Sequence, residues 1–120
     1  MHPRMLALRE VNARINDLRD ITVSQVVRRG DDVDITFEAS PPFVLRLHEV
    51  LALRERGVCN APLVSGFVFV PVTRYGRVAA ARAGIDAADC VEVWIDDVVP
   101  HERVIHRLAA VALDATVIAS

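Results

Sequence analysis

The stretch Ala61-Pro-Leu-Val-Ser-Gly-Phe-Val-Phe-Val-Pro-Val-Thr73 lies in the longest run of the chain without a charged side chain. Read with the two-residue period of a strand, it places Phe67 and Phe69 on one face and valines on the other. Because both faces are apolar, we expect both to be covered, as in an inner strand of a sheet. Pro71 cannot donate a ladder hydrogen bond, so it should mark a bulge, a strand end or an edge segment.

The segments on either side of this stretch supply further strands. Ile21–Arg29 and Val33–Glu38 alternate apolar and polar side chains, and Gly30-Asp31-Asp32 between them is typical of a compact hairpin turn. Val91–Ile95 alternates in the same way after the central stretch. A short strand over Ala115–Ala119 would end the chain.

Three segments have apolar side chains at helical spacing. Pro3–Asp20 predicts an amphipathic helix that lays one face on the sheet. Arg74–Ala83 is rich in alanine and predicts a short helix that ends at Gly84. Pro100–Leu113 predicts a C-terminal helix, with proline near its first turn.

Residues 39–57 allow two interpretations. Ser40 followed by two prolines can open a single helix that ends at Gly57. Alternating apolar side chains favour instead a strand over 43–47, followed by a short helix over 48–56. We favour the second. The whole pattern predicts one α+β domain over 1–120: a mostly antiparallel sheet of about five strands, covered by N- and C-terminal helices.

One segment has a local resemblance to known proteins. Ala83-Gly84-Ile85 and Asp89-Cys90-Val91-Glu92-Val93 follow a short helix, and together they resemble the helix–turn–strand cassette of double-psi barrels and swapped-hairpin transcription factors. Ala88 stands where that cassette has a glycine. The resemblance covers less than a fifth of the chain, and it implies local geometry and no activity.

Composition narrows the class of function. Hydrophobic residues make up 52% of the 120 residues, with a mean hydropathy of +0.31, which is apolar for so small a chain. Either a partner or a second copy covers this excess, or the core is simply rich in Val and Ala. The 14 basic residues are all Arg, as a GC-rich bacterial genome would give, so chemistry that needs Lys is excluded. The net charge of −2 makes nucleic acid an unlikely partner.

The cysteines and the apolar segments bear on the compartment. Cys59 and Cys90 lack metal-site spacing, and whether they pair is left open by the sequence. The N-terminal residues show no secretory signal pattern, and the uncharged central run is too short to span a membrane. We therefore expect a cytoplasmic protein with free thiols and no membrane association.

One acidic group is the best candidate for catalysis. Glu92 and Asp96 share a strand face, Asp97 follows, and His101 opens the next predicted segment. Carboxylates beside a histidine can hold a divalent cation or act as a general acid–base pair. The alternative is a set of solvated acids ahead of a helix N-terminus, which we favour.

Three other motifs carry weaker signals. His101 and His106 are five residues apart, so on a helix they would not share the face that a zinc site needs, and we expect no metal site there. The acidic run 31–34 is too short for a calcium loop. Arg74, Arg77 and Arg82 lie with Tyr75 on a predicted helix, and Arg74 and Arg77 at one end of it could bind an anion, although we favour a solvated helix face.

No complete catalytic or cofactor-binding constellation is visible in the sequence. The leading expectation is therefore a small non-enzymatic protein, without a cofactor, that self-associates as a homo-oligomer or binds another protein. The alternative is a small-molecule or metal-dependent enzyme that uses Asp96, Asp97 and His101. A weaker alternative is a nucleic-acid-binding regulator, which the local cassette suggests. Substrate, partner and pathway are not encoded in any recognisable motif.

Overall fold

The computed structural model describes residues 9–13, 22–39, 41–59, 65–71, 73–98 and 105–119. Within these residues most of the chain is extended, and 9–13 form a short helical segment. The elements are β1 (Thr22–Arg29), β2 (Asp32–Glu38), β3 (Phe43–Arg56), β4 (Ser65–Phe69), α2 (Arg74–Arg82), a 3₁₀ turn η1 (Ala87–Asp89), β5 (Val91–Val98) and β6 (Ile105–Ala119).

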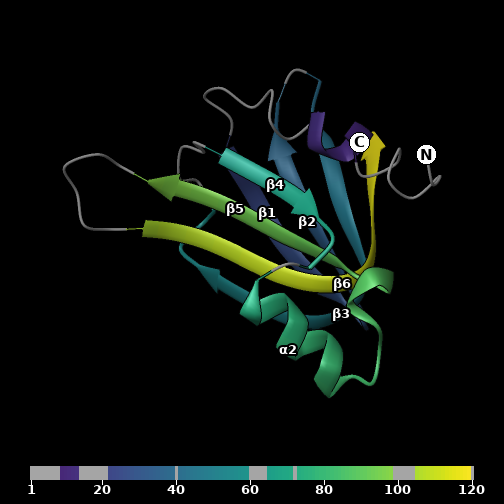
Figure 1. Ribbon diagram of the computed structural model, residues 1–120. Coiled ribbons are helices and arrows are strands. Elements are labelled where there is room, and N and C mark those ends of the chain that lie inside the picture. Colours follow the sequence, from purple (N-terminus) through teal and green to yellow (C-terminus); the bar gives the residue numbers. More distant parts are fainter. Residues whose placement is uncertain are drawn as a thin grey trace.

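The six strands form one antiparallel sheet with the order β1-β2-β3-β6-β5-β4 (Figure 1). The expected hairpin is confirmed: β1 pairs with β2, and Gly30 takes the positive φ of 62° that its turn requires. The helix expected over 74–83 is confirmed as α2, and it lies against the outer face of the sheet (Figure 1). No helix among the described residues is long and apolar enough to cross a membrane.

The sheet bends because its two longest strands bend together. β3 and β6 pair along almost their whole length, but β2 pairs only with 43–47 of β3 and β5 only with 105–112 of β6. At the corner Glu49 has a φ of 52°, and the register shifts between Val50 and Ala52. Such a bulge turns a strand sharply. The sheet therefore consists of two halves that face each other. The first half contains β1, β2 and the paired ends of β3 and β6 on one side of the corner, and the second half contains β4, β5 and the parts of β3 and β6 on the other side.

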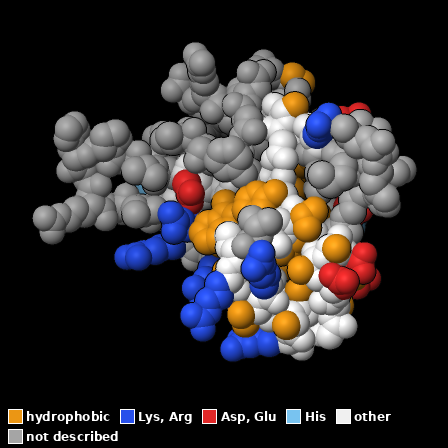
Figure 2. Space-filling model, viewed as in Figure 1, with side chains coloured by type: hydrophobic (Ala, Val, Ile, Leu, Met, Phe, Trp, Pro, Cys, Tyr) orange, Lys and Arg blue, Asp and Glu red, His pale blue; other side chains and the backbone are white. Residues whose placement is uncertain are grey.

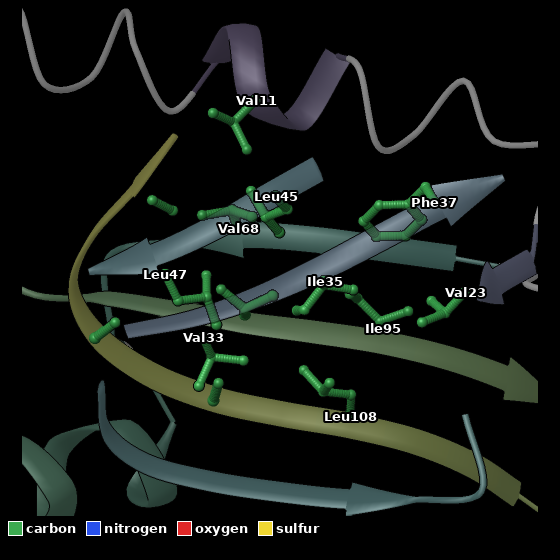
Figure 3. Close-up of a cluster of buried hydrophobic side chains, with 14 of the residues drawn as sticks. Val11, Val23, Val33, Ile35, Phe37, Leu45, Leu47, Val68, Ile95 and Leu108 are labelled. Carbon is green, nitrogen blue, oxygen red and sulfur yellow. The ribbon is translucent and has the colours of Figure 1, made fainter. Parts of the chain in front are cut away.

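The inner core fills the space between these two halves (Figure 3). Phe37 and Phe43 stack there with ring centroids 4.8 Å apart, and both are fully buried. Val11 of the helical segment packs against the same cluster from above. The other large members come from all six strands: Val23, Val33, Ile35, Leu45, Leu47, Val68, Ile95 and Leu108.

A second, smaller cluster covers the outer face of β6. Ala80 of α2 and Cys90 pack on Val111, while Leu108 and Ala110 point to the inner core. β6 is therefore buried on both faces between Leu108 and Ala112.

The expected C-terminal helix over 100–113 is wrong, because 105–119 form β6 and leave no terminal helix over the sheet. A strand that is buried on both faces is continuously apolar, so its sequence does not differ in period from a buried helix. The run Leu108–Leu113 is such a case. Residues 100–104 lie outside the described part of the chain.

The short helix expected over 48–56 is also wrong, because β3 continues as a strand to Arg56. Its partner β6 is about sixty residues away in the sequence, so local propensity does not report the pairing that extends it. The sheet consequently has six strands, not about five, and it is not covered by N- and C-terminal helices. Of the predicted N-terminal helix, 9–13 are helical and the rest lies outside the described residues.

The central apolar stretch forms β4, which is an edge strand and not an inner one. Val68 is fully buried and Phe69 half-buried, while the side chain of Phe67 is outside the described part. The role given to Pro71 is confirmed, because β4 ends at Phe69 on an edge of the sheet. The free side of β4 is covered by Asn12, whose amide Oδ1 accepts from the Val68 N–H at 2.5 Å and whose Nδ2 donates to the Val68 carbonyl.

The burial of the phenylalanines predicts different mutational costs. Phe37→Ala removes a fully buried ring and should lower the free energy of unfolding by about 3–5 kcal/mol. Phe69→Ala removes a half-buried ring on an edge strand and should cost only about 1–2 kcal/mol. Urea unfolding of the two variants checks this order. Equal costs would contradict the edge position of β4.

An ion pair ties β2 to β3 on the first half of the sheet. Asp34 and Arg46 are direct cross-strand partners, and the guanidinium donates twice to the carboxylate, at 2.8 and 3.0 Å. These hydrogen bonds hold the pKa of Asp34 below its ordinary value of 3.8, against the opposing effect of burial. The pair is therefore more stable with Asp34 ionised.

Asp34→Asn should lower the free energy of unfolding at neutral pH by about 1–3 kcal/mol. Because the folded pKa of Asp34 is depressed, the stabilisation is complete above 3.8 and is lost as the pH falls through the folded value. The gap between wild type and variant, measured by urea unfolding from pH 7 to pH 3, should shrink. The matched control is Asp31→Asn, an exposed side chain of the neighbouring turn, which should show no such gap.

Candidate functional site

The outer face of the second half of the sheet gathers polar and aromatic side chains from three strands. Direct cross-strand partners share a face of the sheet. Arg54 of β3 and Trp94 of β5 both pair with Ala109 of β6, so the three form one row. In the next row Arg107 of β6 lies between Arg56 and Asp96, in the same order of strands.

Tyr75, from the first turn of α2, joins these rows. Its ring meets that of Trp94 edge to face, with centroids 6.0 Å apart, and its hydroxyl donates to the Ala109 carbonyl at 3.3 Å. The guanidinium of Arg54 lies 5.1 Å from the centre of the Tyr75 ring, and Arg107 lies at the same distance from Trp94. Burial raises the pKa of the Tyr75 phenol, although the nearby Arg54 opposes this. Each aromatic ring is thus stacked with an arginine.

Two adjoining hollows, of about 740 and 360 Å³, flank this aromatic pair, and Arg54 and Tyr75 line both. Figure 2 shows basic side chains around a hydrophobic patch on the face that carries α2. We call the two hollows together the arginine groove. Its basic and aromatic lining consists of Arg54, Arg56, Arg74, Arg82, Arg107, Tyr75 and Trp94.

The groove has a charge opposite in sign to that of the whole chain. Five of the 14 arginines line it, whereas the chain carries a net charge of −2. Against these stand Glu55 in the lining and Asp96, which accepts from Arg107 at 2.7 Å. An excess of guanidinium groups beside aromatic rings favours anionic ligands, because guanidinium forks match carboxylate and phosphate oxygens.

Glu92 is fully buried beneath the groove and connects its elements. Its Oε2 accepts from the Thr73 hydroxyl at 2.7 Å and from the indole N–H of Trp94. The Thr73 hydroxyl in turn accepts from the Gly76 N–H at 3.2 Å and so caps α2. α2 has no acidic side chain in its first turn, and Glu92 places a carboxyl group at this positive end from β5. The carboxyl group thereby orients both Trp94 and the start of α2.

Gly76 makes this arrangement sterically feasible. A Cβ atom at this position would overlap Glu92 Oε1 and would lie 2.8 Å from Pro71 Cβ. Oε1 itself has no hydrogen-bond partner among the described residues. The carboxyl group therefore occupies the space that a side chain at position 76 would need.

Gly76→Ala should lower stability, although Gly→Ala inside a helix usually raises it by about 1 kcal/mol. We expect a loss of about 1–3 kcal/mol, because the added methyl group meets a buried carboxyl group. The loss should shrink in a Glu92→Ala background, which provides the control as a double-mutant cycle in urea. A Gly76→Ala protein as stable as wild type would contradict this packing.

Of the acidic group expected from the sequence, the structure describes the side chains of Glu92 and Asp96. Glu92 is buried under the groove, and Asp96 is held by Arg107. β5 does not end at Ile95 but continues to Val98. The side chain of Asp97, and His101 altogether, lie outside the described residues. Within the described part of the chain no three His, Cys, Asp or Glu side chains group as metal ligands, and Cys59 and Cys90 do not form a disulfide.

Of the two arginines proposed for an anion site, Arg74 lines the groove and Arg77 does not. Arg54, Arg56 and Arg107 were missed, because the sequence interpretation placed them on helices that do not exist. The signal that would have found them is the strand alternation of residues 54 and 56, together with a β6 strand to pair with them.

Comparison with known proteins finds no matching family model, no matching curated protein and no matching solved structure.

Proposed function

We propose that this protein is a non-enzymatic binding module that holds an anionic partner in the arginine groove. The observation that carries the proposal is the gathering of five arginines around Tyr75 and Trp94 on a chain of net negative charge. Binding fits this lining better than catalysis does, because it offers donors and aromatic surface but no nucleophile paired with a base. Protein binding was also the leading expectation from the sequence.

The other functions expected from the sequence stay predictions. The metal-dependent enzyme depends on Asp97 and His101, whose side chains are not described. Self-association is tested by measuring the molecular mass of the protein in solution, for example by light scattering. A nucleic-acid partner is tested by the oligonucleotide arm of the experiment below.

The chain contains one Trp and one Tyr, and both lie in the groove, so its intrinsic fluorescence reports on this site alone. Titration with poly-L-glutamate should change the Trp94 emission saturably, because a ligand on Arg107 alters the cation that stacks on the indole. Binding should weaken as salt rises, since the contacts are ionic. Arg54→Ser and Arg82→Ser should each lower the affinity by about five- to tenfold, or roughly 1–1.4 kcal/mol.

Arg77→Ser is the matched control, because Arg77 is exposed on the same helix as Arg82 but does not line the groove. It should bind poly-L-glutamate as wild type does. Equal losses in all three variants would mean a diffuse charge effect and not a site. No response to poly-L-glutamate, inorganic polyphosphate or a single-stranded oligonucleotide would refute the proposed function.

A further inference from the structure

Beside the arginine groove, β3 has an edge that no strand among the described residues covers. β2 pairs with β3 only over 43–47, and beyond the corner the described residues place β6 alone next to it, on the opposite side. The last contact on the free side is the bond from the Val50 N–H to the Asp31 carbonyl, at 2.7 Å. Residues 51–56, which we call the free edge of β3, therefore have backbone groups on this side that no described strand pairs, and 51–54 line the larger hollow.

The other edges of the sheet are covered, at least in part. Asn12 occupies the hydrogen-bonding groups of Val68 on β4. β1 has an isolated bridge between Val23 and Cys59. The free edge of β3 differs, because 51–54 line an open hollow between the strand and α2.

Two observations indicate which partner fits this edge. Three arginines line the hollow beside it, Arg54, Arg74 and Arg82, with no acidic side chain among the lining residues. Val78 also lines it, and it is the one large hydrophobic side chain that is exposed among the described residues, at 38%. A partner must therefore bring negative charges and at least one apolar group.

We propose that the partner is an acidic segment of another protein, which binds in extended form and adds a strand to the free edge of β3. This inference rests on the proposed function and specifies its ligand. In strand addition the main-chain hydrogen bonds supply affinity, and alternate side chains supply specificity. A nucleic acid would satisfy the arginines but would leave the strand edge unpaired.

A second copy of this chain fits the edge less well. Antiparallel pairing of two free edges would bring Arg54 and Arg56 of one copy close to the same side chains of the other. Like charges in neighbouring cross-strand positions are destabilising. The charge of the edge thus opposes self-pairing and favours an acidic strand.

The face of the sheet on which each β3 side chain lies determines which type of side chain is expected at each position of the partner strand. Arg54 and Arg56 lie on the outer face with Trp94 and Arg107, whereas Leu53 packs against the inner core. Acidic side chains are therefore expected next to the arginines, and an apolar side chain next to Leu53. Alternating acidic and apolar residues meet this requirement.

The test uses the full chain and a capped peptide of alternating Glu and Val, as long as the free edge, with Trp94 fluorescence as the readout. The peptide should bind, and a peptide of the same composition with all Glu before all Val should bind clearly less tightly. Two further versions carry N-methyl groups on one or the other alternate set of amides. Only one set faces β3 in an added strand, so one version should lose about tenfold or more in affinity and the other should not.

Each alternative gives a distinct result. If both methylated peptides bind as the parent does, strand addition is overturned while anion binding in the groove stands. If a single-stranded oligonucleotide binds and the peptide does not, the partner class is overturned. If neither the peptides nor poly-L-glutamate bind, the proposed function itself fails. If the protein is a dimer that binds the peptide only after dilution to monomer, the occupant of the free edge is a second copy of the chain and not an acidic segment.

Discussion

The burial of β6 on both faces is the constraint on which the rest of the structure depends. Its inward side chains require a second layer on the inner side, and the bent sheet provides this layer with its own first half. Its outward side chains, such as Val111, require α2. A chain of 120 residues forms few secondary-structure elements, and one bent sheet here supplies both layers of the core. The corner at Glu49 is therefore as necessary to the fold as the apolar side chains are.

The same constraint explains where the arginine groove lies. α2 is short, and it covers β6 around Val111 but does not reach Arg107. The outer face changes there from small apolar side chains to guanidinium and aromatic groups. Glu92 stands at this boundary, and its hydrogen bonds to Thr73 and Trp94 fix the covered and the open parts relative to each other. The groove is thus a consequence of how little of the sheet the helix covers.

The sequence was sufficient for the elements whose pairing is local. The hairpin of β1 and β2, the helix α2 with its stop at Gly84, and the alternation of β5 all follow from patterns within about ten residues. It was insufficient for β3 beyond His48 and for β6, because these strands are defined by each other across about sixty residues. The sequence missed most residues of the candidate site for the same reason. Arg74 was recognised from its own helix, whereas Arg54 and Arg107 meet only through the register of β3 and β6.

The bridge between Val23 and Cys59 joins β1 to the residues that follow β3. Among the described residues it is a single isolated pair, whereas β3 and β6 are joined along most of their length. A sheet folded back on itself opens most easily where the fewest bonds cross, so we expect partial unfolding to begin with β1 leaving Cys59 and not with the separation of β3 from β6. The groove lies on the opposite side of the corner, so we expect such opening to leave its shape unchanged.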